Sequence, residues 1–253
     1  MALAAALVAV PGGTAAPGRS DEFSDPELTS SLWKQIDGDV RDGVRPAWDV
    51  GRTTAGELTI VPGISWWVDD SRAFYLYELV RGDFKATARI DVSGKAGGVP
   101  TANWSLSGIL VRSPSGDTDR RNENWVSFRS GAVSGSPAFE RKTTVRSHSQ
   151  LVLDPETPGW VELRVARVGP RFVLLRRYPG GTWKLHWVYP RYDLPKVLQV
   201  GIDAFSGFDD TNADLVAHVD WFHFAKTSVP AKLRVKYLRG GVGLKKLLPY
   251  LRR

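Results

Sequence analysis

The sequence predicts an all-β fold, a two-layer antiparallel β-sandwich, on three observations. Between about residues 21 and 226, short apolar segments of alternating polarity are separated by Gly, Pro, Asp and Ser clusters at roughly ten-residue spacing. No apolar repeat of helical period runs for three turns in this region. Hydrophobic residues make up 42% of the chain and include ten tryptophans, which indicates a buried core rather than disorder.

Eight segments carry the period-two alternation of a strand that presents two different faces. In chain order they are E-L-T-I-V (57–61), F-K-A-T-A-R-I-D-V (84–92), L-S-G-I-L-V-R (106–112), N-W-V-S-F-R (124–129), W-V-E-L-R-V-A-R-V (160–168), R-F-V-L-L-R-R-Y (171–178), L-Q-V-G-I-D-A-F (198–205) and V-A-H-V-D-W-F-H-F (216–224). A further strand is expected around Glu140 in F-E-R-K-T-T.

We assign residues 19–227 to one sandwich domain because the sequence shows no internal repeat and no second core. Residues 1–18 hold a short apolar run and then small residues suited to cleavage near Ala16. This segment resembles the second half of a secretion signal without its positively charged first region. We therefore expect a secreted or extracellular protein. No segment approaches the ~20 apolar residues that a transmembrane helix needs.

Residues 228–253 form a basic tail that accounts for the net charge of +7. The tail holds eight of the 34 basic residues and no acidic one, which leaves 26 basic against 27 acidic residues elsewhere. Its leucines at helical spacing are Leu244, Leu247, Leu248 and Leu251. A basic amphipathic end suits an anionic envelope surface or acidic polysaccharide, without specific recognition of nucleic acid. The alternative is a disordered, solvated tail.

The absence of cysteine excludes disulfides, thiolate nucleophiles and cysteine metal sites. With only four histidines, the chain has few ligands for a transition-metal site. Chemistry in this protein would therefore depend on carboxylates, hydroxyls or bound ions.

Several segments, in this order, carry a resemblance to a known superfamily. They are D-E-F-S-D-P-E-L (21–28), W-D-V-G-R-T-T-A-G-E-L-T-I (48–60), F-Y-L-Y-E-L-V-R-G-D-F-K-A-T-A-R-I (74–90), S-G-I-L-V-R (107–112), N-W-V-S-F (124–128), F-E-R-K-T-T (139–144), G-W-V-E-L-R-V-A-R-V-G (159–169), G-G-T-W-K (180–184) and V-D-W-F-H-F (219–224). Together they resemble the concanavalin A-like lectin/glucanase sandwiches. More narrowly, they resemble the non-catalytic sandwich at the carboxy-terminus of bacterial β-xylosidases. The resemblance implies a jelly-roll sandwich associated with glycan binding or glycan-active enzymes.

An active glucanase of this superfamily is expected to carry E-x-D-x-x-E on one strand, with both carboxylates on the same face. The chain has eight glutamates, and none begins this pattern. Retaining hydrolysis by the usual route is therefore disfavoured.

The residues expected to bind a glycan are aromatic side chains and two charged ones. Aromatic rings offer apolar faces to sugars, and an arginine or a glutamate can hydrogen-bond hydroxyl groups. In I-S-W-W-V-D-D (64–70), neighbouring side chains of a strand would point to opposite faces, and we expect the second tryptophan to be the stacking ring. The predicted ligand residues are Trp67, Arg112, Trp125, Glu140, Trp183 and Trp187. The alternatives are structural ion pairs for Arg112 and Glu140 and core packing for the rings.

In D-D-T-N-A-D-L (209–215), Asp210, Asn212 and Asp214 have the spacing of oxygen ligands in a calcium loop. Leu215 and Trp221 stand where an EF-hand needs Gly and Glu, so that motif is rejected. A different calcium site in this loop is possible, and no other cofactor is indicated.

The sequence thus predicts a secreted carbohydrate-binding module, non-catalytic, with a basic tail for an anionic surface. Two alternatives remain. One is a glycoside hydrolase or polysaccharide lyase with atypically placed carboxylates. The other is a structural envelope-interaction protein whose active part is the tail.

Overall fold

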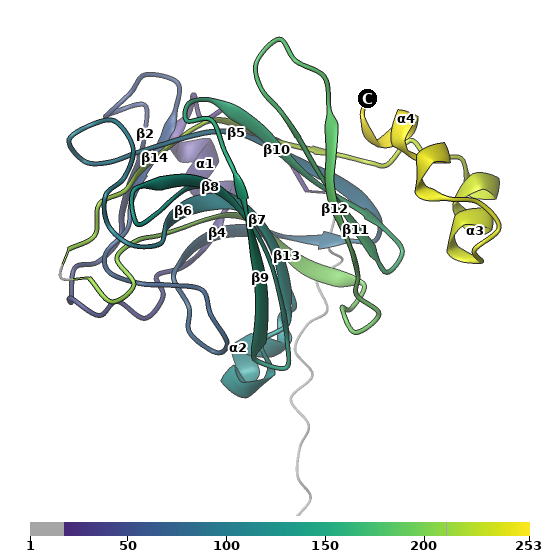
Figure 1. Cartoon of the computed structure of the whole chain (residues 1–253), viewed down its shortest axis with the longest axis horizontal. Coiled ribbons are helices and arrows are strands. Elements are labelled where there is room, and N and C mark those ends of the chain that lie inside the picture. The colour runs from purple at the N-terminus through teal and green to yellow at the C-terminus, as the bar shows by residue number, and fades with distance from the viewer. Residues whose placement is uncertain (1–17, 211) are drawn as a thin grey trace, which may run out of the picture.

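A computed structural model describes residues 18–210 and 212–253, which form a sandwich of two seven-stranded sheets (Figure 1). All pairings between the named strands are antiparallel. The two-layer all-β architecture expected from the sequence is therefore confirmed. The signal-like segment lies outside the described residues, apart from Gly18.

Sheet 1 has the strand order β1, β4, β13, β6, β7, β8, β9, and sheet 2 has the order β12, β11, β10, β5, β14, β3, β2. The strands of sheet 1 are β1 (Lys34–Ile36), β4 (Phe74–Arg81), β6 (Ser105–Arg112), β7 (Trp125–Val133), β8 (Ser136–Val145), β9 (His148–Pro155) and β13 (Val197–Phe205). The strands of sheet 2 are β2 (Ala47–Val50), β3 (Leu58–Val61), β5 (Phe84–Ser93), β10 (Val161–Val168), β11 (Arg171–Arg177), β12 (Lys184–Pro190) and β14 (Val216–Ala225).

Each of the eight segments expected to be strands overlaps one, because their alternation matches the two faces of a sheet. By contrast, I-S-W-W-V-D-D does not form a strand. Only Ile64 makes an isolated bridge there, to Ser206, and the remaining residues belong to the loop that joins β3 to β4. We name this segment, residues 62–73, the covering loop.

Helices are short in the described residues. They are α1 (Pro26–Leu32), α2 (Ser115–Thr118), η1 (Arg120–Asn122), α3 (Ala231–Leu238), η2 (Leu244–Lys246) and α4 (Leu248–Leu251). The first begins at Asp25, whose side chain accepts hydrogen bonds from the main-chain N–H groups of Glu27 and Leu28.

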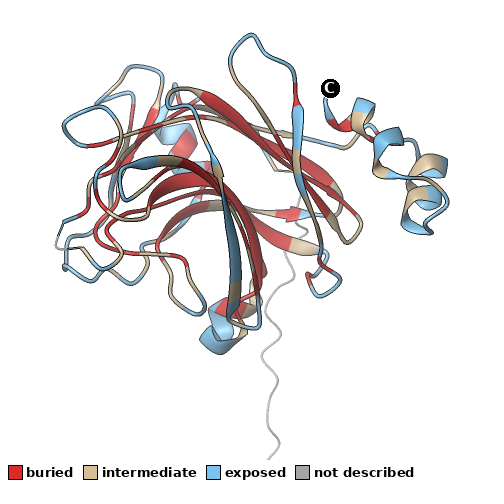
Figure 2. Ribbon diagram, viewed as in Figure 1, coloured by how far each residue is buried: buried red, intermediate tan, exposed pale blue. Residues whose placement is uncertain are grey.

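The core lies between the sheets, where alternate residues of each strand meet (Figure 2). On β13, for example, Val200, Ile202 and Ala204 point into this core. Asp203 and Phe205, which alternate with them, point outward, and yet they are also buried. All residues of β6 and of β10 are likewise buried. The outer faces of both sheets must therefore be covered by other parts of the chain.

The outer face of sheet 1 is covered by the covering loop. Trp67 and Ala73 of this loop pack in one buried cluster with Tyr75, Trp125 and Phe205 from the strands beneath.

The part of the outer face of sheet 2 formed by β10 and β11 is covered by the basic tail, which lies beside β11 and β12 in Figure 1. Its four leucines at helical spacing pack in one cluster with the sheet, whereas the sequence led us to expect an end that contacts an anionic surface or is solvated. Leu247 and Leu251 are fully buried against Val173 and Leu175 of β11. Arg234 of α3 also forms an ion pair with Asp83 at 2.5 Å. The tail is thus a packed layer of the fold with its cations on the outside.

We predict that Leu247→Ala lowers the free energy of unfolding by about 2–5 kcal/mol, because it opens a cavity under the tail. The control Leu238→Ala removes a side chain that is 36% exposed, and its cost should stay below about 1 kcal/mol. Urea unfolding of the full chain measures both. Equal small effects would show that the tail does not pack on the sheet in solution.

Candidate functional site

The outer face of sheet 1 brings together polar and aromatic side chains from several strands. Period-two alternation on β7 turns Trp125, Ser127 and Arg129 to this face. Cross-strand register places Glu140 of β8 opposite Arg129, and Arg112 of β6 opposite Trp125. Three of the residues expected to bind a glycan therefore lie on adjacent strands.

At the centre of this face is a charge cluster formed by Arg129, Glu140, Lys142 and Asp203. The Nε and Nη2 atoms of Arg129 donate to Oδ2 of Asp203 at 2.8 and 2.5 Å, and its Nη1 atom donates to Glu140. The Nζ atom of Lys142 lies 3.7 Å from Oε2 of Glu140 and donates to the main-chain oxygen of Trp67 at 2.6 Å. Two cations thus balance two carboxylates, and all four side chains are buried.

Gly108 of β6 makes the Arg129–Asp203 contact possible. In the sheet, β6 lies between β7 and β13, and Gly108 is the register partner of both Arg129 and Asp203. A Cβ atom at this position would lie 2.2 Å from the main-chain oxygen of Phe128. Any larger residue here would therefore displace the main chain of β7, from which Arg129 reaches across β6 to Asp203.

Burial shifts the ionisation of the charge cluster. It raises the pKa of Asp203 to about 6, although Arg129 opposes this shift. Burial also lowers the pKa of Lys142, against the opposing influence of Glu140. For Arg129, burial disfavours the charge, but the carboxylates of Asp203 and Glu140 outweigh it and raise the pKa. Asp203 therefore holds its proton to a higher pH than a solvent-exposed aspartate does.

Several buried polar atoms around the cluster have no hydrogen-bond partner among residues 18–210 and 212–253. They are Nε1 of Trp67, Nε1 of Trp125, Oγ of Ser127, Oε2 of Glu140 and Oδ1 of Asp203. An unsatisfied buried polar group costs about 1–3 kcal/mol. Since donors and acceptors occur together here, the region is suited to water molecules or to hydroxyl groups of a ligand.

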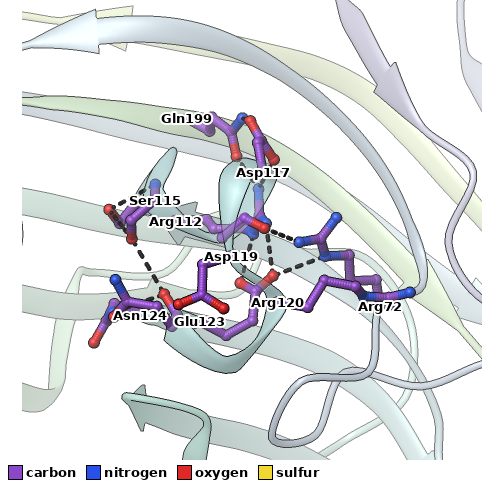
Figure 3. A network of polar contacts seen from close by, with 12 residues as sticks. Arg72, Arg112, Ser115, Asp117, Asp119, Arg120, Glu123, Asn124 and Gln199 are labelled. Carbon is purple, nitrogen blue, oxygen red and sulfur yellow. Dashed lines mark hydrogen bonds and ion pairs between the residues drawn. The ribbon is translucent and has the colours of Figure 1, made fainter. Parts of the chain in front are cut away.

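Arg112 belongs to a separate ion-pair network at the end of β6 (Figure 3). Its Nε and Nη2 atoms donate to the two carboxylate oxygens of Glu123 at 2.7 and 2.6 Å, and its Nη1 atom donates to Asp117 and Gln199. Arg72 of the covering loop donates to the same glutamate at 2.7 Å. The Arg112 side chain is fully buried, and its three guanidinium nitrogens all donate hydrogen bonds to protein groups. These contacts hold α2, η1 and the covering loop against the sheet. No part of the guanidinium is therefore exposed to bind a sugar.

Beside the charge cluster, the surface has a small aromatic hollow with a volume of about 110 Å³. Lys142 and Phe205 lie among its deeper lining residues. Other residues that line it are Trp66, Trp67, Val68, Trp104, Leu151 and Phe208. The rings of Trp66 and Phe208 meet edge to face at 5.0 Å. The hollow thus has aromatic walls, and the buried Lys142 lies among its lining residues.

The two neighbouring tryptophans have different roles. Trp67 is fully buried and packs against Trp125 at 6.1 Å between ring centroids, so neither ring presents an open face to solvent. Trp66 is only partly buried and lines the hollow. The expectation that Trp67 supplies the stacking ring is therefore not met, because the loop turns its first tryptophan outward and its second toward the sheet.

Three of the seven non-glycine residues with positive φ in the described part of the chain lie at or beside residues that line the aromatic hollow. Trp104 has a φ of 55°, Asp69 of 52° and Asp209 of 63°, values that non-glycine residues rarely adopt. Asp69 is fixed by two hydrogen bonds with Ser149 of β9, each 2.8 Å long. Such strain persists only where surrounding contacts impose it, and it is frequent at binding sites.

The remaining predicted ligand residues lie elsewhere. Trp183 is on the outer face of sheet 2, where it is 6% exposed and packs under the tail. Trp187 lies on the edge strand β12 and is 44% exposed, with the guanidinium of Arg141 3.8 Å from its ring centroid. The six predicted residues thus belong to three surfaces rather than one.

The predicted calcium ligands are held in hydrogen bonds. Asp214 accepts from N and Oγ1 of Thr101, both at 2.8 Å, and from N of Lys95 at 2.7 Å, and these contacts lower its pKa. Asp210 accepts from the main-chain N–H of Asn103. Within residues 18–210 and 212–253, no group of three or more His, Asp or Glu side chains is placed to hold a metal ion.

Comparison with known proteins identifies the fold. No protein-family model and no curated protein matches the chain. Among solved structures, the GH43 protein BlXynB of Bacillus licheniformis matches 86% of this chain and 41% of its own length, with a TM-score of 0.62 and 14% identity. A Saccharomyces cerevisiae protein described as functionally unknown matches 78% of this chain and 97% of its own length, with a TM-score of 0.56 and 14% identity.

The GH43B protein of a Bacteroides ovatus xyloglucan locus matches 82% of this chain and 39% of its own length, with a TM-score of 0.57 and 15% identity. The chain therefore spans less than half of these GH43 proteins. It has a concanavalin A-like lectin/glucanase fold, as the sequence resemblance implies.

Several residues of this face were not singled out from the sequence. Arg129 and Asp203 could have been found, because alternation places Arg129 on the face of Trp125, and Asp203 is a charged residue in an otherwise apolar strand. The hollow residues Trp66, Trp104 and Phe208 lie in loops, for which period-two alternation gives no orientation.

We predict that Arg129→Gln destabilises the protein by about 3–5 kcal/mol, because it leaves two buried carboxylates without their cation. The control is Arg120→Gln, which breaks an ion pair with Asp39 whose side chains are 52% and 47% exposed. This change should cost less than about 1 kcal/mol. Chemical denaturation measures both variants, and similar losses would contradict the assigned burial of the charge cluster.

The raised pKa of Asp203 predicts a pH dependence of stability. Because the folded state holds this proton more tightly than the unfolded state, the contribution of Asp203 is full below the unfolded pKa and falls as the pH rises toward about 6. Over this range the free energy of unfolding should fall more steeply for the wild type than for Asp203→Asn. Parallel pH profiles of the two proteins would contradict this assignment.

Proposed function

We propose that this protein is a non-catalytic carbohydrate-binding module whose ligand contacts the aromatic hollow on sheet 1. The observation that supports this proposal is the grouping of Trp66, Trp104 and Phe208 around one hollow. Aromatic faces provide apolar contact to a pyranose ring. Lys142 also lines the hollow, but its side chain is buried and its Nζ atom already donates to the main-chain oxygen of Trp67. The matching GH43 structures agree with a glycan ligand.

The size of the hollow indicates how a glycan would bind. Ligand pockets for whole small molecules usually measure about 300–1,000 Å³, and this one measures about 110 Å³. A sugar chain would therefore lie across the aromatic rim and place one substituent inside. Affinity for each sugar unit would be weak, and it would increase with the length of the chain.

The proposal of a non-catalytic module rests on the carboxylates. Glu140 and Asp203 both bind Arg129 and are fully buried, so neither is positioned to protonate or attack a glycosidic bond. The alternative, a hydrolase or lyase with atypical carboxylates, is favoured by one feature. Asp203 has a raised pKa and shares a cation with a second carboxylate, as the acid of such a pair would.

We further propose that the protein is secreted and that its tail contacts an anionic surface. Several tail cations, among them Lys232, Lys236 and Lys245, are exposed. Among the described residues, no helix is long and apolar enough to cross a membrane. If the envelope-interaction alternative is correct, exchange of the exposed cations Lys232, Lys236 and Lys245 for glutamine will abolish surface binding, while the full chain binds no glycan.

Calcium binding by Asp210, Asn212 and Asp214 stays a prediction. A calcium ion there would have to compete with the hydrogen bonds that Lys95 and Thr101 donate to the Asp214 carboxylate. Millimolar calcium is expected to raise the melting temperature of the wild type and not that of Asp214→Asn. Magnesium serves as the control ion, and a melting temperature that does not respond to calcium would contradict this prediction.

For the glycan site, we predict that Trp66→Ala weakens binding to a glycan selected on an array by about tenfold, since one stacking ring is lost. Trp187→Ala is the matched control, because this ring is exposed on a different strand edge. Calorimetry compares the affinities, and incubation of the same glycan with the protein tests for cleavage. A larger effect of Trp187→Ala would move the site to β12, and released sugars would favour the enzyme alternative.

A further inference from the structure

The aromatic hollow on sheet 1 is too small for a whole sugar ring. Its volume is about 110 Å³, whereas an apolar cavity of about 150 Å³ holds one benzene molecule. A pyranose ring with its hydroxyl groups is larger than benzene. The hollow therefore has room only for a group of a few atoms that projects from a sugar, and the chemistry of its walls indicates which group this is.

The walls of the hollow are apolar. Of the eight described residues that line it, seven are aromatic or aliphatic, and the eighth is Lys142. A hydroxyl group placed inside without a partner would lose its hydrogen bonds to water, whereas a methyl group would gain from burial. The walls therefore favour a substituent that ends in an apolar group.

The charges next to the hollow disfavour an anionic substituent. Lys142 donates to the main-chain oxygen of Trp67 at 2.6 Å, and its Nζ atom lies 3.7 Å from Oε2 of Glu140. Arg129 binds both Glu140 and Asp203. A carboxylate or phosphate in the hollow would be a third negative charge beside two cations, in a site where burial adds to its cost. An uncharged substituent is therefore favoured.

One wall of the hollow holds a hydrogen-bond donor without a partner. Trp67 lines the hollow and is fully buried. Its Nε1 atom has no hydrogen-bond partner among residues 18–210 and 212–253. Buried N–H groups are nearly always paired in native proteins, and an indole N–H can only donate. Its partner must therefore be an acceptor, such as a water oxygen or the carbonyl oxygen of a ligand.

We propose that the hollow binds the acetyl group of an acetylated sugar, an inference that rests on the glycan binding proposed above. The methyl group of the acetyl packs against the rings of Trp66, Trp104 and Phe208, and the sugar ring lies outside on the rim. The carbonyl oxygen accepts a hydrogen bond from Nε1 of Trp67. An acetyl group is small and uncharged, ends in a methyl group and carries one acceptor. A methyl group alone would leave the Trp67 donor unpaired.

The test compares acetylated sugars with partners that lack the acetyl group, by calorimetry on the full chain. O-acetylated xylotriose is paired with xylotriose, and tri-N-acetylchitotriose is paired with cellotriose, so that every probe is neutral. We expect at least one acetylated probe to bind about tenfold more tightly than its partner. The pair that shows this preference identifies an ester-linked or an amide-linked acetyl group. O-methylated xylotriose, which has methyl groups without a carbonyl, should bind more weakly than the acetylated probe that is preferred.

The role of the Trp67 donor is tested by a matched pair of variants. Trp67→Phe removes the N–H and keeps an aromatic ring, and it should reduce the preference for the acetylated probe by about fivefold. The control is Trp125→Phe, because Trp125 is also fully buried with an unpartnered Nε1 atom in the described part of the chain and does not line the hollow. This variant should keep the preference within about twofold of the wild type. Melting temperatures show that each variant is folded.

The wild-type chain provides a second measurement that does not depend on the folding of a variant. The indole N–H signal of Trp67 should shift when the acetylated probe is added and stay in place when its unacetylated partner is added. The signal of Trp125 should move less. An unmoved Trp67 signal at saturating acetylated probe would overturn the proposal, and so would an equal loss of preference in Trp67→Phe and Trp125→Phe.

Failure of this proposal can be distinguished from failure of the proposed function. If acetylated and unacetylated sugars bind equally, and Trp66→Ala weakens both, the acetyl preference is wrong and the glycan site stands. If an unacetylated array glycan binds and no acetylated probe does, the same conclusion follows. If no array glycan and no acetylated probe binds, both proposals are wrong.

Discussion

The ion pairs of Arg129 are the interaction on which the proposed binding face depends. The side chain starts on β7, crosses β6 at Gly108, and binds carboxylates of β13 and β8. It thereby joins four neighbouring strands of sheet 1 from the outer side. Lys142 continues the cluster to the main chain of Trp67, so the same charges also hold the covering loop in place. The buried charges are costly unless they remain paired, and this cost favours one arrangement of loop and sheet.

Parts of both outer faces of the sandwich are covered, and the candidate glycan site lies at the edge of one cover. On sheet 1, the covering loop buries Trp67 and leaves Trp66 at the aromatic hollow. On sheet 2, the tail buries Leu247 and Leu251 against β11. The exposed cations Lys232, Lys236 and Lys245 belong to the tail itself, whereas the buried cations beneath its end belong to β5 and β10.

The sequence predicted the fold well because alternation is a local property of each strand. From the sequence, Arg112 and Glu140 were expected to bind a glycan, with structural ion pairs as the alternative. In the structure, both residues form buried ion pairs, as that alternative states. Their partners Glu123 and Arg129 were not predicted, since pairing depends on strand order and register, which one sequence does not reveal. If residues 64–70 formed a strand, the side chains of Trp66 and Trp67 would point to opposite faces, but the sequence does not determine which of the two rings is exposed. That choice is made by the loop, through Asp69, Ser149 and the contact of Lys142 with Trp67.

The most direct test of the central claim, glycan binding at the aromatic hollow, is a titration followed by the indole N–H signals of the ten tryptophans. Addition of an oligosaccharide selected on an array should shift the signals of Trp66 and Trp104 together, with a common affinity. The signals of Trp187 and Trp221 should stay in place during the same titration. Shifts confined to Trp187 or Trp221, or no shift of any indole signal at saturating oligosaccharide, would contradict the account.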